Sequence, residues 1–309
     1  MAYYLSEINE RCRLDAAAYV AECNAVYHHE LENAADRILS NYIHSPIVLL
    51  SGPSGSGKTT TSKKISEILA KRHMTVHYVA MDDYFVSVGE DTPRLPDGGY
   101  DLESPLCLDM ELLNDHFSRL SRGEKVFVPS YDFTKQRRDP VKGHELQLKD
   151  DEIVVFEGIH ALNDMITDVH PEAYRLYISA RSNVLDDDGN IVFKGTWMRL
   201  MRRTIRDYLF RGTAAEETLE RWASVRRGEK LYISPYKDKA NLQFDSSFGY
   251  EVPMMNNTVT ELFKALPADT PRYEELVSIL PAFELFEDSP VELLPKDAML
   301  REFMGGGIY

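Results

Sequence analysis

The sequence lacks any apolar run long enough to cross a lipid bilayer. A membrane-spanning helix needs about 18–20 consecutive apolar residues, and no stretch of this chain comes near that length. The first seven residues also lack the basic region and the apolar core of a secretory signal peptide. We therefore expect a cytoplasmic protein with no membrane partner.

Cysteine is scarce, and basic residues are outnumbered by acidic ones. The three cysteines, Cys12, Cys23 and Cys107, have no metal-ligand spacing, and an odd number without a signal peptide indicates reduced thiols. With 35 basic and 50 acidic residues the net charge is −15, which argues against nucleic acid as a partner because its phosphates would be repelled. Any anionic ligand must therefore be held by a local basic cluster.

One segment, GPSGSGKT at residues 52–59, matches the phosphate-binding pattern GxxxxGK[ST] at every position. It follows an apolar strand pattern at 47–50 and precedes a helical pattern that runs to Arg72. The alternative is an ordinary Gly/Ser-rich turn, but such a turn needs no Gly-Lys-Thr at its end. The sequence therefore predicts a nucleoside triphosphate site made by Gly52, Ser54, Gly55, Ser56, Gly57, Lys58, Thr59 and Thr60.

Short apolar segments alternate with helical patterns along the middle of the chain. Strands are predicted at 47–50, 76–81, 125–128, 153–156 and 175–179, with helices at 59–72 and 108–122. This alternation predicts an α/β fold with a doubly wound parallel sheet and helices on both faces. We expect three parts: an N-terminal helical extension (1–45), an α/β domain that contains the phosphate-binding pattern (46–265) and a C-terminal helical wrap (266–309).

The two ends of the chain have patterns of their own. Residues 3–42 predict one or two helices that pack on the sheet, with a partner-binding arm as the alternative. After residue 265, five prolines break the chain into short pieces, which favours a surface wrap over a second domain.

Acidic side chains end two of the predicted strands. Glu157 follows the strand at 153–156, where it could hold Mg²⁺ or its water, and Asp82 and Asp83 follow the strand at 76–81. One of these aspartates is placed to accept the proton of an attacking hydroxyl. The alternative for the pair is a helix cap or a turn, and for Glu157 an exposed strand end.

A strongly basic helix is predicted across residues 195–213. Helical spacing puts Arg199, Arg203 and Arg206 on one face, with Arg202 beside them and Arg211 further on. Arginine forks bind phosphate oxygens and can neutralise charge on a moving phosphoryl group. The segment therefore predicts a lid over the phosphates, with a solvated basic face paired to acids as the alternative.

The order and spacing of these motifs resemble the uridine kinase and phosphoribulokinase family of P-loop kinases, from about Pro46 to Met255. The resemblance rests on GPSGSGKT at 52–59, MDDYF at 81–85, YDLESP at 100–105, PSYDF at 129–133, EGIH at 157–160 and RLMRRTIRD at 199–207. In addition, SVRRGE at 224–229 and MLREFMGG at 299–306 look like a bacterial branch of uridine kinase-like nucleoside kinases.

The resemblance implies a P-loop NTPase-type fold and a role for each motif. Asp82 would be the base that activates the acceptor hydroxyl, acting with Lys58, Arg203 and Arg206 as catalytic residues. Thr59 and Glu157 would hold Mg²⁺. The ATP-binding lid would be made by Arg202, Arg203, Arg206 and Arg211. Glu103 would bind the ribose hydroxyls. The resemblance also leaves room for a homo-oligomer.

Three positions depart from the family pattern. Gln136 stands where uridine kinases carry a base-contacting histidine, Thr213 replaces a lid arginine, and Arg221-Trp222 replaces a Gln-Tyr pair. An amide such as Gln136 can still donate and accept at a base edge, whereas Lys135, Arg137 and Arg138 could equally recognise an anionic acceptor. We expect the acceptor site to include Asp82, Tyr84, Glu103, Tyr131, Gln136 and Arg138.

These observations predict an ATP- and Mg²⁺-dependent kinase for a small-molecule hydroxyl. The favoured acceptor is the 5′-hydroxyl of a pyrimidine nucleoside. The alternatives are a kinase for a sugar, a sugar phosphate or another small acceptor, and an ATP-binding regulatory protein without turnover.

Overall fold

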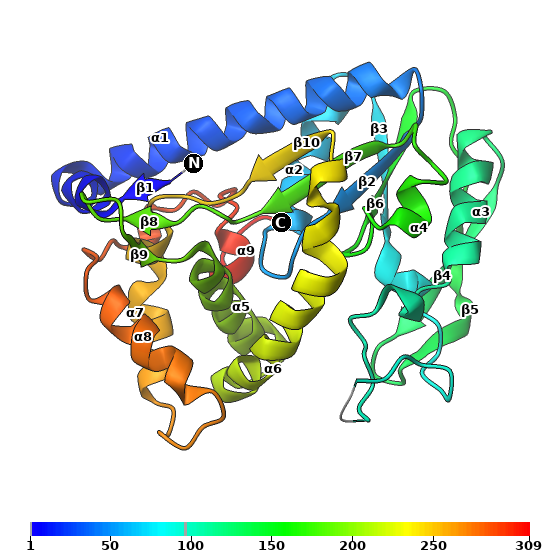
Figure 1. Ribbon diagram of the computed structural model, residues 1–309. Helices are drawn as coiled ribbons and strands as arrows, with labels where there is room; N and C mark the ends of the chain where they lie inside the picture. The colour runs from blue at the N-terminus through cyan, green and yellow to red at the C-terminus, as the bar shows by residue number, and fades with distance from the viewer. Residues whose placement is uncertain (1, 96–97) are drawn as a thin grey trace.

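The computed structural model describes residues 2–95 and 98–309, and its centre is a five-stranded parallel sheet (Figure 1). The strand order is β10-β7-β2-β6-β3. The strands are β2 (Ile47–Ser51), β3 (Thr75–Ala80), β6 (Glu152–Glu157), β7 (Tyr174–Ser179) and β10 (Leu242–Asp245). Every residue of β2 is buried, which explains its unbroken apolar sequence, because a central parallel strand is covered on both faces.

Helices cover both faces of this sheet. Side chains alternate along β2, so that Val48 and Leu50 pack in one core cluster with α1 (Leu5–Tyr42) and α2 (Lys58–Lys71). Ile47 and Leu49 face the other cluster, which contains α3 (Met110–Ser121) and α4 (Asp164–Thr167). The predicted doubly wound α/β fold is confirmed.

A second group of helices extends from one end of the sheet and appears below it in Figure 1. The long helices are α5 (Gly195–Arg211), α6 (Ala215–Gly228), α7 (Glu251–Lys264) and α8 (Tyr273–Phe283). α5 ends at Gly212, whose φ of 62° is a left-handed conformation that favours glycine. Shorter elements are the turns of 3₁₀ or π helix Met81–Tyr84, Pro105–Cys107, Glu229–Ile233, Ser234–Lys239 and Val291–Leu293, and the α-helical turn α9 (Arg301–Met304).

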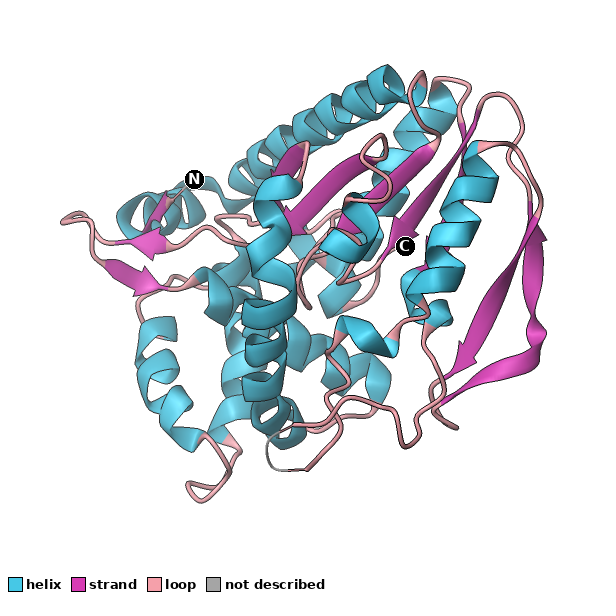
Figure 2. Cartoon of the chain, turned by 45° about the vertical axis from the view of Figure 1, so that its right-hand side comes forward, coloured by secondary structure: helices cyan, strands magenta, loops and turns pink. Residues whose placement is uncertain are grey.

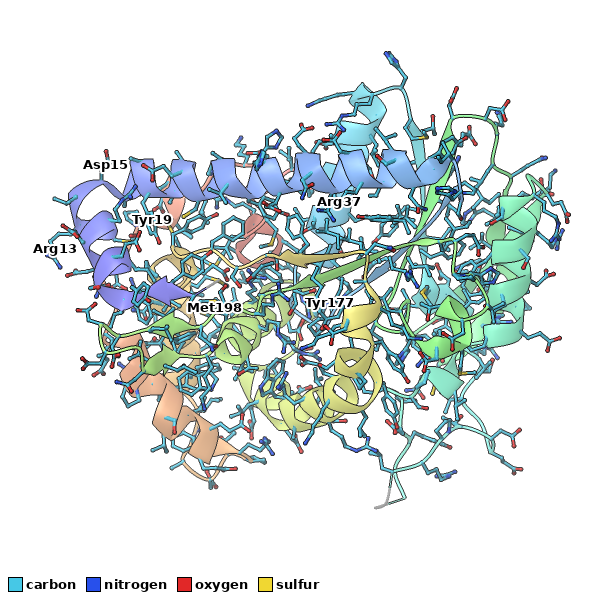
Figure 3. The ribbon with its side chains drawn as sticks, turned by 45° about the horizontal axis from the view of Figure 1, so that its top comes forward. Arg13, Asp15, Tyr19, Arg37, Tyr177 and Met198 are labelled. Atoms are coloured by element: carbon cyan, nitrogen blue, oxygen red, sulfur yellow. The ribbon has the colours of Figure 1, made fainter. Side chains whose placement is uncertain are left out.

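The N-terminal extension is one long helix with a sharp bend. α1 is kinked at Asp15, which has a non-helical φ of −160° and ψ of 85°. The Asp15 carboxylate accepts a hydrogen bond from the Ala18 amide at 2.9 Å and so restarts the helix. Figure 3 shows Asp15 at the corner, with the remainder of α1 lying along the sheet.

The predicted strand at 125–128 forms, but it does not join the parallel sheet. β4 (Val126–Asp132) pairs antiparallel with β5 (Arg137–Leu146) in a hairpin that stands apart from the main sheet (Figure 2). The prediction missed β5 because most of its residues are exposed and polar and it contains Pro140. Two strands joined by a short turn can pair only antiparallel, so β4 pairs with β5 and does not take the parallel neighbour that the alternation of strands and helices predicted.

Four further strands escaped the sequence patterns. β10 lies at the sheet edge and is only partly apolar. β1 (Tyr3–Tyr4), β8 (Val184–Leu185) and β9 (Ile191–Phe193) are too short to show a period and form a small separate sheet. Within the part of the chain that the structure describes, no helix combines the length and the apolarity of a membrane span.

Candidate active site

The site lies at the carboxyl edge of the parallel sheet, where three strands end side by side. Leu50 of β2 and Ala80 of β3 are both register partners of Glu157 at the end of β6. The phosphate-loop segment therefore leaves β2 next to Glu157, and Asp82 leaves β3 on its other side. Ligands of open α/β sheets bind at this edge.

The phosphate-loop segment is held from behind by buried polar groups. Gly55 and Gly57 have φ values of 75° and 76°, and a Cβ on Gly55 would lie 2.9 Å from the Arg199 carbonyl oxygen. The Ser246 hydroxyl donates to the Ser56 carbonyl at 2.6 Å. The Ser56 hydroxyl is buried without a hydrogen-bond partner, so a polar group remains to be satisfied inside the segment.

Lys58 and Glu157 face each other across this edge. The Lys58 ammonium lies 3.7 Å from Glu157 Oε1 and donates to the Pro53 carbonyl at 3.3 Å. The Tyr78 hydroxyl donates to Glu157 Oε2 at 2.5 Å. Burial, together with the Glu157 charge, raises the pKa of Tyr78, so the hydroxyl keeps its proton and orients the carboxylate.

The oxygen atoms here suit a magnesium ion. Mg²⁺ takes oxygen ligands and is usually held by one or two carboxylates together with substrate phosphates. Glu157 is partly exposed and Thr59 is exposed, so both can reach a ligand. Among residues 2–95 and 98–309 no cluster of three or more metal-ligating side chains occurs, so an ion bound here would need phosphate oxygens as well.

Of the two aspartates in the Asp-Asp pair, Asp82 has the environment that suits a proton acceptor. Its side chain is exposed, and partial loss of hydration followed by the Glu157 charge raises its pKa to about 6, against the opposing effects of Lys58 and Arg211. Asp83 has a structural task, because its Oδ1 accepts a hydrogen bond from the Tyr131 amide at 3.2 Å. A carboxylate with a pKa near 6 is matched to general-base work near neutral pH.

Two arginines of α5 are buried under the phosphate-loop segment. Arg202 is fully buried: its Nε and Nη2 donate to the Glu251 carboxylate at 2.7 and 2.6 Å, and its Nη1 donates to the Gly55 carbonyl at 3.1 Å. Arg199 forms a similar pair with Glu229, at 2.8 and 2.7 Å. Predicted as an ATP-binding lid residue, Arg202 instead has its nitrogens engaged by protein in this conformation.

The other three arginines gather around one carboxylate on the cleft side. Arg203, Arg206 and Arg211 lie 3.2, 2.7 and 3.6 Å from the oxygens of Asp207. Arg203 also donates to the Ser54 hydroxyl at 2.8 Å, which ties α5 to the phosphate-loop segment. Three guanidinium groups against one carboxylate leave an excess of positive charge beside that segment.

Glu103 lies against the last residue of α6, since a Cβ on Gly228 would lie 2.6 Å from the Glu103 Cβ. Burial raises its pKa, and its charge interacts with those of Arg203, Asp82 and Lys58. Sequence reasoning missed the groups that hold this segment. The neighbouring Asp101 is buried and accepts hydrogen bonds from the Tyr232 hydroxyl at 2.7 Å and from Arg227 at 3.3 Å. The only sequence signal for this clamp was the SVRRGE segment that supplies Arg227.

An apolar cavity of about 160 Å³ is lined by Leu102, the residue before Glu103. Two of the predicted acceptor residues, Tyr131 and Gln136, also line it. Its walls include Phe85, Leu102 and Phe133. The Tyr131 ring lies 5.6 Å from Phe85 and 5.0 Å from Phe133, measured between centroids. Flat apolar walls with a single amide are suited to a planar ring with polar edges.

Two other predicted acceptor residues are not available to an acceptor in this conformation. Tyr84 is wholly buried, with its hydroxyl 2.8 Å from His116 Nδ1. Its neighbour Phe85 takes the place in the cavity wall. Arg138 is engaged by Asp109 at 3.0 Å and by the Tyr84 carbonyl at 3.0 Å. Both roles stay predictions, and the direction of these side chains depends on long-range packing, which the sequence motifs do not encode.

Comparison with known proteins gives a family match that covers more than half of the chain. The model of the phosphoribulokinase / uridine kinase family matches residues 47–249, which is 203 of 309 residues. A uridine kinase of Borrelia turicatae is 28% identical over 197 residues, covering 63% of this chain and 84% of that protein. A uridine kinase of Schizosaccharomyces pombe is 30% identical over 199 residues, covering 62% of this chain and 39% of that protein. The solved structure of a possible uridine kinase from Bacillus stearothermophilus has a TM-score of 0.41 at 18% identity, covering 64% of this chain and 88% of that one. On the family match, this chain belongs to the phosphoribulokinase / uridine kinase family.

Proposed function

We propose that this protein is an ATP- and Mg²⁺-dependent kinase whose acceptor is the 5′-hydroxyl of a pyrimidine nucleoside. The observation that carries the proposal is the position of Asp82. Its charge interacts with those of Glu157, Lys58 and Glu103, and the Lys58 ammonium lies 3.7 Å from Glu157 Oε1. A phosphoryl donor and a hydroxyl acceptor would thus meet at a carboxylate with a pKa of about 6.

On the donor side, catalysis requires charge stabilisation. Lys58 would leave its contact with Glu157 for the β- and γ-phosphates, and Arg203 and Arg206 would turn from Asp207 toward the transferring group. Bound Mg²⁺ would supply additional charge neutralisation, held by Thr59 and Glu157. Arg202 would support the Gly55 backbone from below rather than touch ATP.

On the acceptor side, the cavity walls favour a base over a phosphate. The aromatic rings of Phe85, Tyr131 and Phe133 offer stacking surfaces, and Gln136 offers one donor and one acceptor. Lys135 lies 2.9 Å from Asp132, and Arg138 is also paired. A sugar phosphate acceptor would require these two cations to leave their present partners.

The deciding experiment is phosphoryl transfer from ATP with Mg²⁺ to a panel of nucleosides, sugars and sugar phosphates. We expect uridine or cytidine to be phosphorylated with the highest kcat/KM. Transfer only to a sugar or a sugar phosphate would replace the proposed acceptor. ATP binding without transfer to any acceptor would favour a regulatory protein.

The Asp82→Asn variant tests the assignment of the base. We expect kcat to fall by a factor of about 10²–10⁴, as is usual when a general base is removed, while ATP affinity is kept. Asp83→Asn is the matched control, because an asparagine at 83 can still accept from the Tyr131 amide. Near-normal turnover of Asp82→Asn would refute the role.

A further inference from the structure

The end of the chain, outside the family match, lies directly on the phosphate helix α2. Glu302 Oε2 accepts a hydrogen bond from the Thr60 amide at 3.0 Å, a contact between residues 242 positions apart. A Cβ on Gly57 would lie 2.6 Å from the Met299 sulfur, so this methionine covers the phosphate-loop segment closely. In Figure 1 the red α9 lies next to α5, behind the same segment.

This terminal segment is fixed at both ends. Asp297 pairs with Lys64 of α2 at 2.9 Å, and the hydroxyl of Tyr309 donates to Glu67 at 2.8 Å. Phe303, between them, is fully buried. The segment is therefore a formed wall of the molecule next to α2.

Beside these contacts, a cavity of about 310 Å³ lies between the terminal segment, the phosphate helix α2 and the lid helix α5. Thr59 and Thr60 line it on the α2 side, Phe210 on the α5 side, and Gly305, Gly306, Gly307 and Tyr309 on the C-terminal side. The cavity thus begins at the last two amides of the phosphate-binding segment, where a bound triphosphate chain would leave it.

The walls of this cavity suit a flat nucleobase. Phe210 is 57% exposed, and Tyr309 is the second aromatic residue that lines the cavity. The polar side chains of Lys63, Arg301 and Glu302 complete the lining. Gly305 brings the backbone close to Phe210, since a Cβ there would lie 2.9 Å from its ring. Aromatic side chains stack on bases, and glycine lets a ligand approach the backbone.

We propose that this cavity binds the nucleoside part of the phosphoryl donor, with Phe210 as the stacking residue and the C-terminal segment as one wall. Glu302 occupies the Thr60 amide until a donor phosphate displaces it. The inference rests on the proposed function, because it assigns the remainder of the donor whose phosphates bind at 52–59. The C-terminal segment would then set the affinity for the donor.

The test compares two probes in direct binding measurements without an acceptor. ADP carries a nucleoside, whereas inorganic tripolyphosphate does not. We expect Phe210→Ala to lower ADP affinity by about tenfold, the usual scale of base–aromatic stacking, and to leave tripolyphosphate affinity unchanged. Leu209→Ala is the matched control, because Leu209 is an exposed neighbour on α5 outside the cavity.

Glu302 is tested in the same assay. Glu302→Ala removes the competing acceptor and should raise ADP affinity by about tenfold, since hydrogen bonds to charged groups are the stronger ones. Glu302→Gln keeps a hydrogen-bond acceptor but no charge, so its ADP affinity should lie between those of the unaltered protein and Glu302→Ala. Thermal unfolding without ligand confirms that each variant is folded.

Two outcomes would overturn the inference. One is an equal ADP affinity of Phe210→Ala and Leu209→Ala, and the other is a loss of ADP affinity in Glu302→Ala. The Lys58→Ala variant separates this failure from a failure of the proposed function. If the unaltered protein binds both probes and Lys58→Ala binds neither, the phosphate site is supported independently of the result for Phe210→Ala. If the unaltered protein binds neither probe, both proposals fail.

Discussion

Replacing Arg202 by methionine separates two roles for the basic helix. If Arg202 supports the phosphate-loop segment from below, its loss should lower the free energy of unfolding. If it contacts ATP as a lid residue, its loss should weaken nucleotide binding and spare stability. The contacts favour support, because Arg202 is fully buried and its Nε and Nη2 donate to Glu251.

The magnitude follows from what Arg202→Met leaves behind. Glu251 is also fully buried, and without Arg202 it keeps one amide donor, that of Phe248 at 2.7 Å. Breaking a buried ion pair from one side costs about 3–5 kcal/mol. For a chain of this length unfolding as one unit, that corresponds to a Tm lower by roughly 5–8 °C.

Urea and thermal unfolding without ligand measure this loss. Arg211→Met is the control, because Arg211 is 57% exposed and its pair with Asp207 at 3.6 Å should contribute less than about 1 kcal/mol. The double variant Arg202→Met/Glu251→Leu removes both charges and should recover part of the stability. Unchanged unfolding of Arg202→Met together with weaker ATP binding would refute the supporting role.

Three further predictions concern turnover. The pKa of Asp82 is raised to about 6, and only the ionised carboxylate accepts a proton. We therefore expect kcat/KM to fall tenfold per pH unit well below pH 6. A flat kcat/KM profile from pH 7 to pH 5 would contradict this. Gln136→Ala should raise KM for a pyrimidine nucleoside several-fold and leave KM for ATP unchanged, because a lost hydrogen bond is worth about 1 kcal/mol; equal effects on both would contradict a role at the acceptor. Asp101→Asn should weaken the clamp made by Arg227 and Tyr232 and raise KM for the acceptor more than it lowers kcat, with thermal unfolding as the control for a general loss of stability.

The sheet and the edge that carries the candidate site were predictable because their signals are local. A buried parallel strand is a short apolar run, and the phosphate-binding segment is eight consecutive residues. Glu157 is the last residue of its strand, and Asp82 lies two residues beyond the end of β3. Parallel strands then bring such endings together. These parts of the fold needed only the order of elements along the chain.

The hairpin and the acceptor residues were harder to predict. β5 is exposed and polar, so no period marked it, and β4 was assigned to the parallel sheet. Tyr84 belongs to the MDDYF motif and Arg138 to the basic residues after PSYDF, yet one side chain points into the core toward His116 and the other toward Asp109. A motif fixes the backbone position but leaves the direction of each side chain to its neighbours.

The sequence by itself determined that strands at 47–50 and 153–156 deliver a phosphate-binding segment and a carboxylate to one edge, since hydrophobic period and motif spacing are properties of neighbouring residues. Only the tertiary structure decided which arginines face the cleft and what covers the phosphate helix. The partner of Arg202 is 49 residues away, and that of Thr60 is 242 residues away. Such pairs depend on how the last helices return to the sheet, and burial then selects which charged groups are paired inside and which stay free to meet a ligand.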